Sequence, residues 1–112
     1  MIIVDSKILV KILSLGFANA ITIFPFVFIS SKHLKQDKQI INHEKIHLKQ
    51  QLEMLFIFFY IWYLVEFFIR FIIYKSRSKA YFNISFEREA YDFESAPGYI
   101  DKRKFWAFLK YL

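Results

Sequence analysis

The sequence predicts a mainly α-helical domain with a small β-hairpin or edge strand, and three stretches carry that prediction. Residues 41–51 hold two histidines four positions apart, which is the spacing of side chains on one face of a helix. Residues 54–74 are apolar except for Glu66 and Arg70, a run long enough for a membrane helix. Residues 21–29 are rich in β-branched and aromatic side chains, which favour a strand.

Residues 1–18 are expected to form an amphipathic helix that lies on a membrane surface. Lys7 and Lys11 precede an apolar run at residues 12–17, and the sequence Ala-Asn-Ala follows at residues 18–20. The same order is similar to a signal peptide with its cleavage site. The helix is the favoured interpretation, because Lys11 interrupts the apolar region that a signal peptide needs.

Residues 21–29 are predicted to form a β-hairpin or a bent edge strand. Pro25 lacks an N–H group, so it must lie at an edge or a bend of a sheet. Two roles remain open for this segment. It is either an edge to which a peptide substrate adds as a further strand, or a buried apolar segment that dips into a bilayer.

The motif HExxH at residues 43–47 is expected to hold the chemistry of the chain. On a helix, His43 and His47 project side by side and can chelate one Zn²⁺ ion, and Glu44 can take a proton from water that the zinc activates. The alternative is a solvated helix face with two unrelated histidines. Asp37 is expected to cap this helix, whereas His33 lies in a polar loop and is not expected to be a ligand.

After the apolar run, residues 75–81 are predicted to be a basic linker and residues 85–94 a short acidic helix. Asn83 or Ser85 is the expected N-cap of that helix. Residues 99–112 combine basic and aromatic side chains, which is typical of a helix anchored at a membrane interface. The chain is therefore expected to be one domain, with a zinc-site core at residues 19–94.

The motif HExxHxxQ, which ends at Gln50, and the pattern ExxA at residues 87–90 resemble those of the gluzincins, the thermolysin-like zinc metallopeptidases, especially their very small bacterial members. In that family an edge strand precedes the motif helix, and a later glutamate helix carries the third zinc ligand. The resemblance covers roughly residues 19–94. It implies that His43, His47 and Glu87 bind zinc and that Glu44 is the general base.

Two points of this resemblance stay open. Glu89 lies only two residues from Glu87, so a shift of helix phase would offer Glu89 as the third ligand instead. Thermolysin-like enzymes also often have an acidic residue after the ExxA pattern, where this chain has Tyr91. Asp92 is a candidate substitute for that acid, and Tyr91 itself is a candidate catalytic residue that stabilises an oxyanion.

If Glu87 joins His47 on one ion, residues 41–74 cannot be one straight helix. Such a helix would carry Tyr74 about 40 Å from His47, and the 13 residues left before Glu87 could return only if fully extended. We therefore predict a fold-back near residues 60–63, which gives a helical hairpin about 20 Å deep. Within the apolar run, Glu66 and Arg70 have the spacing of a helical ion pair.

The composition indicates a membrane and not a nucleic acid as the partner of this basic chain, whose net charge is +6. Hydrophobic residues make up 56% of it, and the basic residues flank the apolar run, as in segments that contact anionic lipid headgroups. Signatures of RNA-binding or helix-turn-helix domains are missing from the sequence. The expected location is a bacterial inner membrane, with the site on its cytoplasmic side. The chain has no cysteine, which leaves histidine and carboxylate as metal ligands.

These observations favour a zinc metallopeptidase that cleaves peptides or protein segments near a membrane surface. The main alternative is a non-catalytic membrane subunit, or pseudo-peptidase, that uses the metal or the helical hairpin to bind a larger complex. A hydrolase that acts on lipid or on another amide is a third candidate. A peptidase would have an open coordination position on the zinc ion beside residues 21–29, whereas in a non-catalytic subunit that position would be closed.

Overall fold

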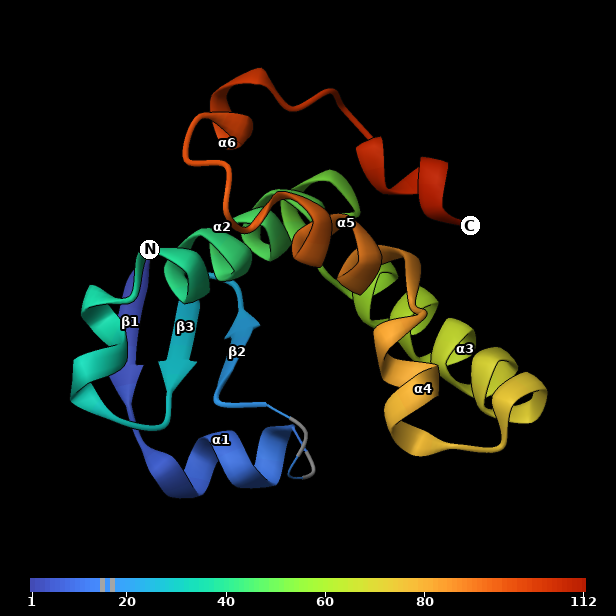
Figure 1. The fold of residues 1–112 in the computed structure, drawn as a ribbon, viewed down its shortest axis with the longest axis horizontal. Coiled ribbons are helices and arrows are strands. Elements are labelled where there is room, and N and C mark those ends of the chain that lie inside the picture. The colour runs from blue at the N-terminus through green and yellow to red at the C-terminus, as the bar shows by residue number, and fades with distance from the viewer. Residues whose placement is uncertain (15, 17) are drawn as a thin grey trace.

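The computed structural model describes residues 1–14, 16 and 18–112, and it is mostly helical with a small three-stranded sheet (Figure 1). The predicted fold class is confirmed at that level. The elements in chain order are β1 (Ile2–Asp5), α1 (Lys7–Leu13), β2 (Ala20–Ile23), β3 (Phe26–Ile29), the 3-10 helix η1 (Lys32–Gln36), α2 (Lys38–Glu53), α3 (Ile57–Tyr74), α4 (Arg77–Phe82), α5 (Ser85–Phe93), α6 (Tyr99–Lys102) and the 3-10 helix η2 (Ala107–Tyr111).

The sheet has the strand order β1-β3-β2. β2 and β3 are antiparallel and form the predicted hairpin, with Pro25 in the bend after a cis peptide bond. β1 pairs in parallel with β3, so the expectation of a helix over residues 1–18 is wrong for residues 2–5. These residues are β-branched except for Asp5, and pairing with β3 decides their conformation. Residues 7–13 of this segment form α1, whereas residues 15 and 17 lie outside the described part of the chain.

α2 crosses the middle of the molecule between the sheet and α5 (Figure 1). It begins where expected, because the Asp37 carboxylate accepts hydrogen bonds from the N–H groups of Gln39 and Ile40. One side of α2 contacts β2 and another contacts α5. This position lets α2 present side chains to both neighbours along most of its length.

The chain does break between the motif helix and residue 74, but the fold-back near residues 60–63 is wrong. α2 ends at Glu53, and Leu55 and Phe56 take positive φ angles of 53° and 60°. α3 then runs without interruption to Tyr74, and α4 and α5 make the return (Figure 1). The unusual φ angles are held by tertiary contacts, since the ring of Phe56 packs on Phe24 at 4.8 Å between centroids.

α3 is long and apolar enough to cross a membrane by length and composition. The predicted ion pair is present, with Arg70 Nη2 3.7 Å from Glu66 Oε2. Glu66 also accepts hydrogen bonds from the backbone N–H and the hydroxyl of Ser85. The Glu66 carboxylate therefore accepts the hydrogen bond of a free N–H group at the start of α5. Neither Asn83 nor Ser85 acts as the side-chain cap that was expected.

The expected linker at residues 75–81 and the expected interfacial helix at residues 99–112 are both absent from the described structure. α4 occupies most of the first segment and packs along α3. The second segment contains the short α6 and η2, and η2 buries Phe108 completely against Phe86 at 4.4 Å between ring centroids. The aromatic side chains of the tail thus fill the protein core and do not all face outward.

Glu89, the alternative candidate for the third ligand, is fully buried. Its carboxylate accepts hydrogen bonds from Gln50, Tyr99 and Arg103, and Arg103 also donates to Glu53. Burial alone would raise the pKa of Glu89, but these bonds hold it below its ordinary value of 4.5. The ionised carboxylate therefore stabilises the fold above about pH 4.5, and this contribution is lost as the pH falls.

We expect Glu89→Ala to lower the free energy of unfolding by about 3–5 kcal/mol, because it removes the fully buried one of the two carboxylates that pair with Arg103 and leaves the donors that face it unsatisfied. Denaturant unfolding followed by circular dichroism measures this change. The exposed Asp101 provides the control, and Asp101→Ala should alter the free energy by less than about 0.5 kcal/mol. Equal effects of the two substitutions would contradict the role of the Glu89–Arg103 pair.

Candidate metal centre

Three potential ligands meet where α2 contacts α5. His43 and His47 lie on successive turns of α2, with their ring centroids 4.8 Å apart. Glu87 comes from the first turn of α5, and its Oε1 lies 3.2 Å from Nε2 of His43 and 3.2 Å from Nε2 of His47. The three side chains are all buried. The structure thus brings Glu87 to the histidines and places Glu89 elsewhere, beside Arg103.

The spacing of these atoms fits a tetrahedral metal ion. Two ligand atoms that each lie about 2.0–2.1 Å from zinc at a tetrahedral angle are about 3.3 Å apart. Both distances from Glu87 Oε1 to the imidazole nitrogens are 3.2 Å, which agrees with that value. His43, Glu44 and His47 also form a group with one potential ligand atom each, all within 4.8 Å of one another. The residues present can therefore hold a metal ion.

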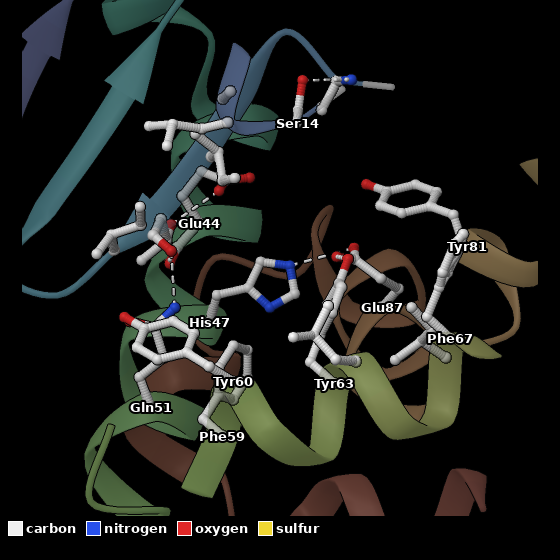
Figure 2. A pocket seen from close by; sticks show the side chains of 18 residues that line it. Ser14, Glu44, His47, Gln51, Phe59, Tyr60, Tyr63, Phe67, Tyr81 and Glu87 are labelled. Carbon is white, nitrogen blue, oxygen red and sulfur yellow. Dashed lines mark hydrogen bonds and ion pairs between the residues drawn. The ribbon is translucent and has the colours of Figure 1, made fainter. Parts of the chain in front are cut away.

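Each of the three potential ligands has a polar partner outside the cluster. Gln50 Oε1 lies 2.7 Å from Nδ1 of His47, and the amide nitrogen of Gln50 donates to Phe86 and Glu89. Because that nitrogen is engaged, the Gln50 oxygen accepts from Nδ1–H and leaves Nε2 of His47 to act as a ligand. The Tyr63 hydroxyl donates to Glu87 Oε2 at 2.8 Å (Figure 2).

The outer partner of His43 is Glu94, which the sequence analysis did not identify. Glu94 Oε2 lies 3.6 Å from Nδ1 of His43. Asp92, the expected substitute, instead accepts a hydrogen bond from the Tyr111 hydroxyl. Glu94 follows Glu87 by seven residues, which is two turns on the same face, and that spacing was the available signal.

Tyr91 contacts His43 through its ring, edge to face, with the centroids 4.5 Å apart. Its hydroxyl lies 3.1 Å from that of Tyr81. Tyr81 and Tyr63 line the cavity beside the site, and sequence reasoning missed both because they come from α4 and α3. Tyr91 therefore packs against a ligand, while other tyrosines line the cavity.

Glu44 lies at the same centre and is oriented from the sheet. Its Oε1 accepts a hydrogen bond from the Thr22 hydroxyl of β2 at 2.8 Å, and its Oε2 lies 4.0 Å from Nε2 of His43. Burial raises the pKa of Glu44 above its ordinary value of 4.5, although both histidines oppose this shift. A buried carboxylate with a raised pKa beside potential metal ligands is a candidate for proton transfer.

The metal-free centre is a buried ion pair. Burial alone would lower the pKa of His47, but the Glu87 carboxylate raises it to about 9. Burial would conversely raise the pKa of Glu87, yet His47 and His43 hold it well below its ordinary value. At neutral pH the metal-free protein therefore holds a proton on His47 and a negative charge on Glu87.

A cavity of about 320 Å³ lies beside this centre. Glu44 and His47 of α2 form part of its wall, together with Glu87 (Figure 2). The rest of the lining is mainly apolar and comes chiefly from α1, β2, α3, α4 and the segment between α4 and α5. Potential ligands and an acid-base group thus face a cavity large enough for part of a small ligand or peptide.

The side-chain amide of Gln51 joins α2 to the end of β2 beside the cavity. Gln51 donates to the Thr22 carbonyl and accepts from the Phe24 N–H, at 2.8 Å each. These bonds fix β2 beside the cavity with Thr22 in reach of Glu44.

Comparisons of the chain with models of protein families, with curated proteins and with solved structures found no match.

Proposed function

We propose that this chain is a zinc metallopeptidase of the gluzincin-like kind, with His43, His47 and Glu87 as the ligands. The observation that supports it is the meeting of three buried side chains, with Glu87 Oε1 3.2 Å from Nε2 of each histidine, beside a buried carboxylate and a cavity. Bound zinc would supply Lewis-acid activation of water and of a substrate carbonyl.

Glu44 is the general base and proton carrier in this proposal. Its carboxylate takes the proton of the attacking water and gives it to the amine that leaves as the peptide bond breaks. Thr22 holds one carboxylate oxygen, so the other is free to face the reacting atoms.

A peptide is the proposed substrate because a strand borders the cavity. Ile21 and Thr22 of β2 line it next to Glu44 and His47. An extended peptide can lie along such an edge and place one of its carbonyl groups toward the ligands. The apolar lining favours hydrophobic side chains on either side of the bond that is cleaved.

The proposal is tested by metal analysis and a hydrolysis assay on the purified full chain. We expect one zinc per chain, cleavage of peptides rich in hydrophobic residues, loss of cleavage after chelation, and recovery when zinc is added back. Zinc at full occupancy without cleavage of any peptide would favour a non-catalytic membrane subunit. Absence of stoichiometric zinc would contradict the site itself.

Zinc binding should release about one proton near pH 7, because His47 must be neutral to bind a metal. In the metal-free protein the pKa of His47 is raised to about 9, so the proton is present below that pH and must be displaced. Zinc affinity should accordingly increase as the pH rises toward 9. Calorimetric titrations in buffers with different ionisation enthalpies measure the number of protons. A value of zero at pH 7 would contradict the ion pair.

A further inference from the structure

Two helices that border the cavity present apolar side chains to the outside. On α1, Ile8 and Ile12 are 72% and 62% exposed. On α3, Leu64 and Phe68 are 57% and 64% exposed, and the same helix also exposes Ile57, Phe58, Ile61, Val65, Ile69 and Ile72. Contiguous apolar surfaces of this kind mark a contact with another molecule or with a membrane.

The mouth of the cavity lies between these two apolar faces. Leu13 of α1 and Leu64 of α3 both line the cavity and are exposed, so they lie at its rim. α1 and α3 lie below α2 in Figure 1, whereas α6 and η2 lie above it. The cavity therefore opens between the two helices that carry the outward apolar faces.

The charges of the described surface complement an anionic bilayer. Fourteen of the 16 lysine and arginine side chains are exposed, whereas only four of the ten acidic side chains are. The other six are glutamates: Glu53 and Glu94 are partly buried, and Glu44, Glu66, Glu87 and Glu89 are buried. Lys7 and Lys11 lie on α1 itself, and Lys75 and Lys79 follow α3, where basic side chains can reach lipid headgroups.

The arrangement of α4 favours a helix that lies in the interface and not one that spans the bilayer. α4 packs along α3 and exposes Arg77 and Lys79. If α3 crossed the hydrocarbon layer, these charges would be carried into it at high cost. With α3 in the plane of the interface, its outer face contacts lipid while Tyr63 and Glu66 on its inner face keep their protein partners.

We infer that the outer faces of α1 and α3 form one docking surface for an anionic lipid bilayer, and that the cavity between them opens toward the lipid. The substrates would then be apolar peptide segments embedded in the membrane, which enter from the side. This substrate class rests on the proposed peptidase function, whereas the docking surface does not.

Docking is tested with environment-sensitive fluorophores, which the chain accepts at single sites because it has no cysteine of its own. Ile12→Cys and Leu64→Cys report on the docking surface, and Phe105→Cys, between α6 and η2, is the control because Phe105 is 74% exposed. Each labelled protein is mixed with vesicles of phosphatidylcholine, with or without phosphatidylglycerol. We expect a blue shift at positions 12 and 64 only, with the anionic vesicles, that weakens in high salt. A shift at position 105 alone, or none at all, would overturn the docking surface.

A matched pair of charge substitutions extends the test. Phe68→Glu should weaken vesicle binding about tenfold, because it removes one inserted apolar side chain, whereas Phe105→Glu should leave it unchanged. Equal effects of the two would likewise contradict docking through α3.

Cleavage then tests the direction of entry. One apolar peptide is offered embedded in anionic vesicles and, with a solubilising tag, free in water. The native protein should cleave the embedded form faster, and Phe68→Glu should lose this advantage while it cleaves the free form at the native rate. An advantage that Phe68→Glu keeps would overturn lateral entry. If the native protein cleaves neither form, the peptidase function fails, and the fluorescence result still decides the docking surface.

Discussion

Replacing Glu44 by glutamine should leave zinc in the protein and lower peptide hydrolysis by a factor of about 10² to 10⁴. The glutamine amide has nearly the same shape and can still accept the hydrogen bond from Thr22, so the fold and the ligands are preserved. It cannot, however, take a proton from water. The loss is therefore expected in turnover and not in metal content.

Turnover of a fluorogenic peptide and zinc content by mass spectrometry measure the two quantities on the same preparations. Thr22→Val is the graded comparison, because it keeps the Glu44 carboxylate and removes only the hydroxyl that orients it. Its turnover should fall between those of the native protein and of Glu44→Gln. Native turnover in Glu44→Gln would exclude Glu44 as the base, and the subunit interpretation would then be preferred.

Removing a ligand should have the largest effect on the metal. We expect His47→Ala and Glu87→Ala to lower zinc affinity by more than about 100-fold, beyond the 10- to 100-fold effects that outer partners usually have. The remaining two ligands cannot complete a tetrahedral set, and each substitution also leaves the other member of a buried ion pair alone. Circular dichroism must therefore accompany the titration to separate loss of metal from loss of fold.

The third histidine of the chain is a matched control for that experiment. His33 is exposed and its Nδ1 lies 2.7 Å from the Ser31 hydroxyl, so His33→Ala should bind zinc as the native protein does. Gln50→Ala and Glu94→Ala should fall between, at about 10- to 100-fold, because each removes only an orienting partner. An equal loss for His33→Ala and His47→Ala would contradict the assignment of ligands.

The parts of the fold that the sequence predicted are those with a local cause. The HExxH helix and its Asp37 cap, the hairpin at Pro25 and the Glu66–Arg70 pair each follow from spacing or from one residue's backbone chemistry. The break at residues 54–56 follows from no such signal, since it contains neither glycine nor proline and is held by distant contacts. The need for a break could be derived from chain length, but its place could not.

The residues that contact the potential ligands from outside the cluster could not be predicted from the sequence for the same reason. Gln50 is on the motif helix, but the groups that fix its amide come from α5, and Tyr63 reaches Glu87 from α3. The basic aromatic tail was assigned to a membrane interface, yet Phe108 fills a space against Phe86 that only the folded chain creates. Such contacts join residues far apart in sequence, so periodicity and capping patterns carry no information about them.

Three hydrogen bonds join α3 to the helix that carries Glu87, so α3 is not an independent module of this protein. Glu66 binds the first residue of α5, and Tyr63 binds Glu87 itself two residues later. A truncation that removes α3 would therefore also release Glu87, the proposed third ligand. A variant with a more polar α3 should keep Tyr63 and Glu66 and exchange only the outward residues of this helix.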